Sequence, residues 1–462
     1  MFSPHEKTTW VGFPNRVVWA ACLAAVVCCC QSTALPAAEA PSPDLLQLIG
    51  DLVGDADKEM RAIGLQQVRA EVPGAAATGH FVQLLPKLRP EARAELIDAL
   101  GERGDPAARA AVLDAAQGPD EAVRSAALRA LAKLGTEADV PLLVPRTAAG
   151  PDGEQQAARQ SLIQLKGDGV NRALTAQVGP APADVRVQLL AILAARNAVE
   201  SLPAVVAAAS APDAPVRLAA LDALRVLADD RQTGDVVKLL QNAASAEQRT
   251  KAEATLLALC GRGREKCVPA LAASLDGADG ETRVTLLQAL ARAGGAAALE
   301  SVASCLVDAD QTVQDEAVRM LSSWPDRAVV PHLEKLAGAE TLRHHVLAVR
   351  GLIRLASPEG ERPADLRLLG QSIRAAKRRD EKQLGLGVLG RVVSLDALTL
   401  AVSLLDDPQI AEDAGWTAGL IAEGLPAGNQ DAIRAALRQV LDRTRTPKPR
   451  AQAEKVLGNM AP

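Results

Sequence analysis

The chain has 462 residues, too many for one ordinary hydrophobic core, so several domains or a stacked array are expected. Hydrophobic residues make up 48% of it, yet aromatic residues are only 2% and tyrosine is absent. Alanine and leucine must therefore supply the core, which favours closely packed helices over a β-sandwich. The formal net charge of −5 argues against nucleic acid as the main partner, because nucleic-acid binding usually requires a basic face.

Residues 1–34 have the order of a secretory signal peptide. Lys7 and Arg16 precede the uninterrupted apolar run Val17–Cys30, and small residues follow up to Ala34. This run is short for a membrane span, which needs about 20 residues. We therefore predict an exported, periplasmic or secreted protein that is cleaved after Ala34 and has no membrane partner once mature. The alternative is a retained segment that anchors the protein in a membrane.

Residues 35–43, rich in proline and alanine, form a short leader, and a continuous helical array is predicted from residue 44 to residue 462. Four of the seven cysteines lie in the signal segment. Only Cys260, Cys267 and Cys305 remain in the array, so no disulfide scaffold is expected to hold it together.

The clearest element of the array is the stretch Asp120–Gly135. Its apolar residues recur at steps of three and four and form one stripe of an α-helix, with Asp120 at the N-cap position. A shorter apolar helix is predicted upstream, over 106–116, and residues 117–119 join the two into a hairpin. Two such helices do not make a core, so the pattern predicts neighbours of the same kind.

The chain repeats this hairpin about thirteen times, at a mean spacing of about 32 residues. The positions that align with Arg124 are Arg61, Arg93, Arg124, Ala158, Arg186, Arg217, Ala252, Arg283, Gln314, Ala348, Lys382, Glu412 and Arg450.

A period of about 32 with two helices and no strand resembles the HEAT-repeat family, in the short bacterial form related to phycobilisome-lyase HEAT-like repeats. The motif Asp-x-x-Val-Arg that carries the resemblance occurs twice and has two looser copies. The resemblance implies an all-α fold, an α-solenoid of about thirteen stacked hairpins that winds into a right-handed superhelix. It also implies a structural ladder between successive repeats, which in this sequence comprises Asp57, Asp120, Asp213 and Asp279 with Arg61, Arg124, Arg217 and Arg283.

Each ladder aspartate precedes its arginine by four residues, so it is placed to cap its helix and to pair along it. Such exposed pairs contribute only about 0.2–0.5 kcal/mol each. We therefore interpret these residues as structural rather than as ligands of an anion.

Two groups of residues could serve function. Cys260 and Cys267 flank a turn between repeats that could bring them within the range of a disulfide, and the alternative is a pair of free thiols. Farther along, residues 357–363 are the longest break in the array and could mark a bend. The basic run after it is either a solvated face or a docking patch for an acidic partner, and it comprises Arg374, Lys377, Arg378, Arg379 and Lys382.

No catalytic, cofactor or metal site is predicted. Of the histidines outside the signal segment, His332, His344 and His345 share one repeat, but adjacent histidines on a helix point about 100° apart, and His332 begins the other helix of the hairpin. No metalloprotease, nucleophile-elbow or phosphate-binding motif occurs either.

Three functions remain open. The first is a non-enzymatic, extracytoplasmic scaffold that binds protein partners through one face of the solenoid. The second is an enzyme or accessory protein of the phycobilisome-lyase type that holds a tetrapyrrole or a peptide. The third is a structural element of the cell envelope, anchored by an uncleaved N-terminus.

Overall fold

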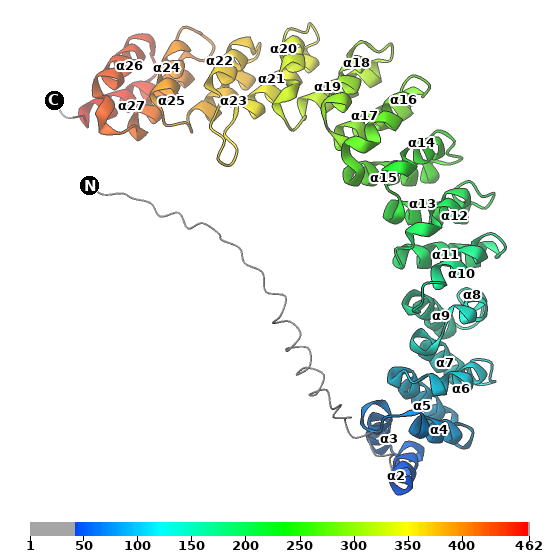
Figure 1. The fold of residues 1–462 in the computed structure, drawn as a ribbon. Coiled ribbons are helices and arrows are strands. Elements are labelled where there is room, and N and C mark those ends of the chain that lie inside the picture. Colours follow the sequence, from blue (N-terminus) through cyan, green and yellow to red (C-terminus); the bar gives the residue numbers. More distant parts are fainter. Residues whose placement is uncertain (1–41, 461–462) are drawn as a thin grey trace, which may run out of the picture. The chain divides into compact units, whose positions relative to one another are not determined.

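A computed structural model describes residues 42–460 of the chain (Figure 1). The predicted signal segment and its cleavage point lie outside the described residues. Within the described range the protein is all-α, as predicted, and forms an α-solenoid of helical hairpins. The chain divides into two compact units, Met1–Leu134 and Gly135–Pro462.

The described part of the first unit contains three hairpins, each with a first and a second helix. They pair α2 (Pro43–Gly54) with α3 (Lys58–Gln66), α4 (Ala75–Leu84) with α5 (Pro90–Arg103), and α6 (Arg109–Ala115) with α7 (Glu121–Leu134). A π-helical turn, η1 (Gln67–Glu71), extends α3, and a 3-10 turn, η2 (Leu85–Lys87), extends α4. The hairpin predicted over 106–135 is confirmed as a 3-10 turn, η3 (Pro106–Ala108), followed by α6 and α7.

The second unit continues the alternation with ten hairpins. Its first helices are α8 (Val140–Arg146), α10 (Val170–Val178), α12 (Leu202–Ala208), α14 (Thr233–Gln241), α16 (Val268–Ala273), α18 (Ala296–Ser304), α20 (Val330–Ala337), α22 (Leu366–Ala375), α24 (Leu395–Ser403) and α26 (Gln430–Arg443). Its second helices are α9 (Asp152–Gln164), α11 (Ala183–Ala195), α13 (Ala214–Leu227), α15 (Ala246–Gly263), α17 (Gly280–Ala293), α19 (Gln311–Ser322), α21 (Leu342–Ala356), α23 (Arg379–Leu389), α25 (Ala411–Gly424) and α27 (Pro447–Gly458).

Many first helices begin with a 3-10 turn, and α18 ends with one. These turns are η4 (Glu137–Asp139), η5 (Val199–Ser201), η6 (Asp230–Gln232), η7 (Arg264–Cys267), η8 (Cys305–Val307), η9 (Arg327–Val329) and η10 (Ala427–Asn429). A proline at the first or second position of α8, α12, α16 and α20 fits this pattern, because the first helical residues need no intrahelical N–H.

In each unit the second helices stack directly on one another, α3–α5–α7 in the first and α9 through α27 in the second. The first helices form the other layer, with contacts such as α8–α10, α14–α16 and α24–α26. The core lies between the layers and within the stack. The apolar stripe predicted on α7 is buried there, from Val123 at 3% exposed to Leu134 at 5%.

Small residues set how closely the second helices approach. In the first unit Gly101 of α5 lies against Ala130 of α7, so that a β-carbon on Gly101 would stand 2.7 Å from the Ala130 Cα. In the second unit Gly415 and Gly419 of α25 leave room for α27, where a β-carbon on Gly419 would meet Gln452 at 2.6 Å. The glycines of α25 thus serve helix packing.

The predicted break at 357–363 is a compact turn inside the second unit. Glu359 and Arg362 exchange backbone hydrogen bonds of 3.1 and 3.0 Å, and Gly360 between them has a φ of 57°, which favours glycine. The boundary between the compact units falls elsewhere, at Leu134–Gly135. Over residues 42–460, none of the helices has both the length and the hydropathy of a membrane span.

Candidate functional site

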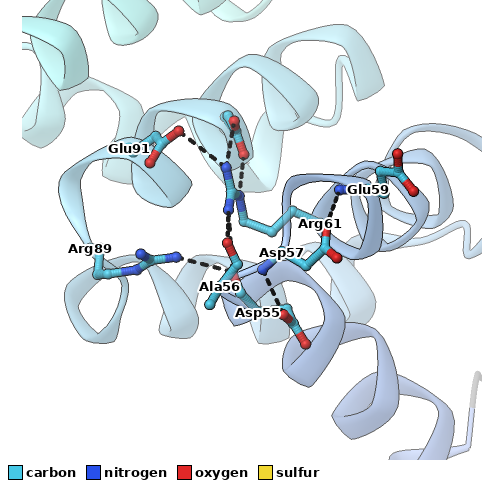
Figure 2. Close-up of polar contacts among 8 residues, drawn as sticks. Asp55, Ala56, Asp57, Glu59, Arg61, Arg89 and Glu91 are labelled. Atoms are coloured by element: carbon cyan, nitrogen blue, oxygen red, sulfur yellow. Dashed lines mark hydrogen bonds and ion pairs between the residues drawn. The ribbon is translucent and has the colours of Figure 1, made fainter.

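The most buried charged group of the first unit is Arg61, which lies between the first two hairpins at 2% exposed (Figure 2). Its Nε donates to one oxygen of Glu95 in α5 at 2.8 Å, and its Nη2 donates to the other at 3.2 Å. Nη2 also reaches Glu91 at 3.2 Å, while Nη1 donates to the carbonyl of Ala56 at 3.0 Å. One guanidinium therefore fixes the turn before its own helix and the helix of the next repeat.

The aspartate four residues earlier acts as a helix cap. The carboxylate of Asp57 accepts from the backbone N–H of Glu59 at 2.8 Å. Asp120 and Asp279 accept from the N–H groups of Val123 and Thr282, at 3.0 and 2.7 Å. Asp213 differs, because it makes no capping hydrogen bond and lies 3.9 Å from Arg186 of the preceding second helix.

Each of the other ladder arginines reproduces part of the geometry of Arg61. Arg124 donates to the carbonyls of the turn before α7, at 3.0 Å to Gly118 and 2.7 Å to Pro119. Arg217 donates to the turn before α13 and, through Nε, to Gln248 of α15 at 3.0 Å. Arg283 of α17 donates to Asp308, in the turn of the next repeat, at 2.5 Å. The acidic partner thus belongs to the following repeat.

Four of the positions aligned in the sequence are wrong. The ladder residue is the fourth after the N-cap of each second helix, and Ser245 and Thr341 are the N-caps of α15 and α21. The position in α15 is therefore Arg249, which pairs with Glu281 of α17 at 3.1 Å, and not Ala252. In α21 it is His345, not Ala348. In α9 it is Gln155, whose side chain donates to the carbonyl of Gly150 at 2.9 Å, and not Ala158. In α25, whose N-cap is Ile410, the ladder residue is Ala414 and not Glu412.

His345 makes the same link between repeats with a different group. It is fully buried, and its Nδ1 lies 2.6 Å from the carbonyl of Ala337 at the end of α20. Its Nε2 accepts the backbone N–H of Lys377, in the turn before α23, at 3.1 Å. Since Nε2 accepts, Nδ1 must carry the proton and donate to Ala337. The imidazole therefore joins two hairpins as both donor and acceptor.

The other two histidines of this repeat have separate partners. His344 bonds to Asp315 of α19 at 2.7 Å, and this hydrogen bond holds the pKa of the Asp315 carboxyl below its usual value. His332 lies 3.4 Å from Glu300. Between residues 42 and 460, no group of three histidine, cysteine or acidic side chains is placed to hold a metal ion.

The three cysteines of the array are free, buried thiols, so the Cys260–Cys267 disulfide considered from the sequence is not formed. Cys260 lies in the last turn of α15, and Cys267 lies in η7, beside Cys260. Burial, followed by the neighbouring Cys267, raises the pKa of Cys260, and burial also raises the pKa of Cys305. Because the thiolate is the nucleophile, burial makes Cys260 and Cys305 less reactive than exposed thiols.

The basic run separates into exposed and buried members. Lys382 is the ladder residue of α23, 8% exposed and bonded to Asp407 at 2.5 Å, so it does not belong to a docking patch. The remaining four side chains are exposed at the end of α22 and the start of α23. Arg374 donates to Ser403 and Lys377 to the carbonyl of Ala339, both at 2.9 Å, whereas Arg378 and Arg379 pair with Asp380 and Asp413.

A group of apolar side chains on the second-helix layer was not predicted. Leu384 of α23 is 46% exposed and Leu420 of α25 is 40% exposed. Trp416, one turn before Leu420, is half-buried, and the Nζ of Lys448 lies 4.3 Å from its ring centroid. We call Leu384, Trp416 and Leu420 the Trp416 patch. Its signal in the sequence was the large apolar residues of α23 and α25 that fall outside the buried stripe.

The comparison with protein-family models agrees with this architecture. Residues 79–163 match the family model described as HEAT repeats. No curated protein matches the sequence. Among solved structures, Kap121p bound to Pho4p aligns with a TM-score of 0.47 and 12% identity, over 89% of this chain and 53% of that one. Kap121p bound to Nup53p gives a TM-score of 0.49 and 12% identity over the same shares. The chain spans about half the length of these proteins, and the likeness concerns the fold alone.

Proposed function

We propose that this chain is an exported, non-enzymatic scaffold that binds protein partners through the second-helix layer of its solenoid. The observation that carries the proposal is the Trp416 patch. Most charged groups around it are engaged in pairs between repeats, such as Arg379 with Asp413 at 2.9 Å and Lys455 with Glu423 at 2.7 Å. Exposed leucines beside a tryptophan remain, and tryptophan is among the side chains that dominate the energetics of protein interfaces.

The patch lies on two adjacent second helices, α23 and α25, which contact each other. Gln383, next to Leu384, donates to Asp413 at 3.1 Å, which ties the exposed face of α23 to the first turn of α25. Trp416 and Leu420 are four residues apart and therefore share one face of α25. A partner helix with apolar side chains spaced by three or four residues fits such a surface.

The partner's charge follows from the basic residues that lead into α23. Arg374 and Lys377 are exposed and donate to the uncharged acceptors Ser403 and Ala339, and Lys448 stands over the Trp416 ring. These side chains favour acidic residues beside the partner's apolar stripe, since complementary charges speed association and exclude wrong partners. The proposed partner is therefore an acidic, amphipathic protein segment.

Export is the second element of the proposal and rests on the order of residues 1–34. N-terminal sequencing of the protein purified from the cell envelope tests it. A first residue at or near Leu35 supports export and removal of the segment. A chain that starts at Met1 and stays in the membrane fraction would instead support an anchored structural element of the envelope.

Cross-linking pull-down from the native envelope with the tagged protein tests the binding surface. The double variant Leu384→Glu, Leu420→Glu should lose the captured protein, because both side chains are exposed and the helices tolerate glutamate. Val307→Glu is the matched control, since Val307 is 87% exposed but lies in η8, two hairpins before α23. Capture that survives in the double variant would refute this surface, and charge reversal at Arg378 and Arg379 tests the basic residues separately.

A further inference from the structure

His345 joins two hairpins through a pair of hydrogen bonds that only the neutral imidazole can make. Nδ1 donates to the carbonyl of Ala337 at 2.6 Å, and Nε2 accepts the backbone N–H of Lys377 at 3.1 Å. The residue is fully buried. In a protonated imidazole both nitrogens are donors, so the bond from Lys377 is lost. The link between α21 and the turn before α23 therefore depends on the protonation state of one side chain.

A buried carboxylate in the first turn of α23 has one oxygen without a hydrogen bond. Glu381 is 1% exposed, and its Oε1 accepts from Nε and Nη2 of Arg350 at 3.2 and 2.8 Å. Its Oε2 is buried, has no hydrogen-bond donor and lies 3.7 Å from Nε of Arg378. A buried carboxylate oxygen is costly to leave without a donor. Oε2 is therefore an acceptor that remains available between the two repeats.

The stacking of the second helices places Glu381 opposite His345. Glu381 is the third residue after the N-cap of α23. In two other joints the residue at this position accepts from the ladder residue of the preceding second helix: Gln248 from Arg217 at 3.0 Å, and Thr282 from Arg249 at 3.2 Å. The ladder residue that precedes α23 is His345. The carboxylate thus occupies the position that faces the imidazole.

We propose that His345 and Glu381 form a proton-operated switch between two hydrogen-bond arrangements of this joint. In the first, Nε2 of neutral His345 accepts the N–H of Lys377 and fixes the turn before α23 to α21. In the second, Nε2 has taken up a proton from solvent, releases Lys377 and donates to Oε2 of Glu381. Nδ1 donates to Ala337 in both. Histidine is the side chain that changes charge between pH 5 and 8, so the switch operates in this range.

The neighbouring histidine, His344, does not make the same exchange. Its Nε2 bonds to Asp315 of α19 at 2.7 Å, and this bond survives protonation because Nε2 is then still a donor. Lys377 and Arg378 are the cations that oppose a protonated His345, and the carboxylate of Glu381 offsets them.

The other charged groups on the elements packed against α21 have partners or face solvent. They are Glu316 with Arg319 on α19, the exposed Glu334 and Lys335 on α20, Arg374 on α22, which donates to Ser403, and Lys382 on α23, which bonds to Asp407. Glu381 is therefore the acceptor that remains for the protonated imidazole.

The released segment belongs to the proposed binding surface. Lys377 is one of its basic residues, and the turn leads into α23, which carries Leu384 of the Trp416 patch. Acidification should therefore change how Lys377 is presented beside the patch. This consequence rests on the proposed function, whereas the exchange of hydrogen-bond partner at His345 does not.

Hydrogen–deuterium exchange of the purified full chain tests the switch, read by mass spectrometry on peptides that contain Lys377 and corrected for the pH dependence of free-amide exchange. This segment should lose protection by about 10-fold between pH 7.5 and pH 5.5. A free imidazole is half protonated near pH 6.5, and each pH unit below that favours the protonated form about tenfold. Peptides that contain Thr282, in a joint without histidine, should keep their protection and serve as the internal control.

Two variants separate the histidine from the carboxylate. His345→Gln keeps a side-chain oxygen that can accept from Lys377 but takes up no proton, and glutamine already occupies the ladder position of α9 and α19. Its Lys377 segment should stay protected at both pH values. Glu381→Gln removes the negative charge that favours the protonated imidazole, so the loss of protection should move about 1 pH unit lower. His344→Gln should leave the transition where it is.

Three results would overturn the switch. The first is a Lys377 segment equally protected at pH 7.5 and pH 5.5. The second is a transition that persists in His345→Gln or disappears in His344→Gln, because another group would then titrate. The third is an unshifted transition in Glu381→Gln. Circular dichroism checks the helices of each variant, and the parent and Glu381→Gln still decide the outcome if His345→Gln does not fold.

Partner capture at the two pH values tests the link to the proposed function separately. Capture that does not change with pH, while protection of the Lys377 segment does, would refute the consequence for binding and leave the switch itself in place. Loss of protection without any captured partner would likewise count against the proposed function alone.

Discussion

Arg61 and Glu95 meet at 2.8 Å, 34 positions apart in the chain, with the arginine 2% exposed. The pair joins the start of one second helix to the body of the next, and the same guanidinium holds the carbonyls of the turn before α3. Removing the cation should therefore do more than delete one surface ion pair, because a single buried guanidinium serves two carboxylates and two turn carbonyls.

We expect Arg61→Met to destabilise the first unit by about 2–3 kcal/mol, the range for hydrogen bonds to charged groups. The measurement is the first transition in urea unfolding, followed by circular dichroism. Arg129→Met is the control, since Arg129 is exposed and its partner Asp98, at 2.7 Å, is partly exposed, so this pair should contribute less than about 1 kcal/mol. Equal losses in the two variants would contradict the structural role assigned to Arg61.

Alanine at Gly101 should destabilise the first unit, whereas alanine at Gly79 should stabilise it. A β-carbon on Gly101 would stand 2.7 Å from the Cα of Ala130, so α5 and α7 must separate, at a cost of about 1–3 kcal/mol. Gly79 lies inside α4 with no atom within 4 Å of such a carbon, so Gly79→Ala should stabilise the unit by about 0.5–1 kcal/mol. Thermal unfolding of the two single variants checks both signs, and a Gly101→Ala variant as stable as the parent would be inconsistent with this helix contact.

Asp315 should make the folding stability of the protein depend on pH in the acidic range. The hydrogen bond from His344, followed by that from Gln311, lowers the pKa of Asp315 in the folded state. A carboxyl whose pKa falls on folding stabilises the protein above its unfolded value of about 3.9, and this stability is lost as the pH falls through the folded value. Asp315→Asn should therefore lower stability by about 1 kcal/mol at pH 7.

The difference between Asp315→Asn and the parent should begin to narrow below about pH 4 and close once the pH falls below the lowered pKa of Asp315 in the folded state. Urea unfolding at pH 7, 5 and 3 measures it. Asp222→Asn removes the exposed pair with Lys251 and should show a smaller loss at pH 7. A difference that is the same at pH 7 and pH 3 would mean that the charge of Asp315 does not carry its contribution.

The buried thiols should react slowly with an alkylating reagent in the native protein. Cys260 and Cys267 are fully buried and Cys305 is 7% exposed, and burial raises the pKa of Cys260 and Cys305. After unfolding, three labels are expected in a chain that starts near Leu35 and seven in the complete chain. The count should not change with reductant, and two additional labels after reduction would reveal a Cys260–Cys267 bridge.

The sequence by itself determined the class of fold, because each helix can be recognised from its own residues. The stripe on α7 and the cap at Asp120 are local patterns, repeated often enough to predict a stack of hairpins. The position of the ladder residue within each second helix was harder to predict. An alignment by spacing placed Ala252 and Ala348 at the ladder, whereas the N-caps of α15 and α21 assign it to Arg249 and His345.

Only the tertiary structure determined which polar and apolar side chains are exposed to solvent. Lys382 belongs to a basic run in the sequence, but its partner Asp407 comes from the next repeat and removes it from the surface. Ile63 reads as an ordinary core residue, and it is exposed because no described hairpin precedes its own. Burial depends on neighbours about 30 residues away in this fold, so a periodic sequence specifies the repeat, while packing between repeats determines where a partner can bind.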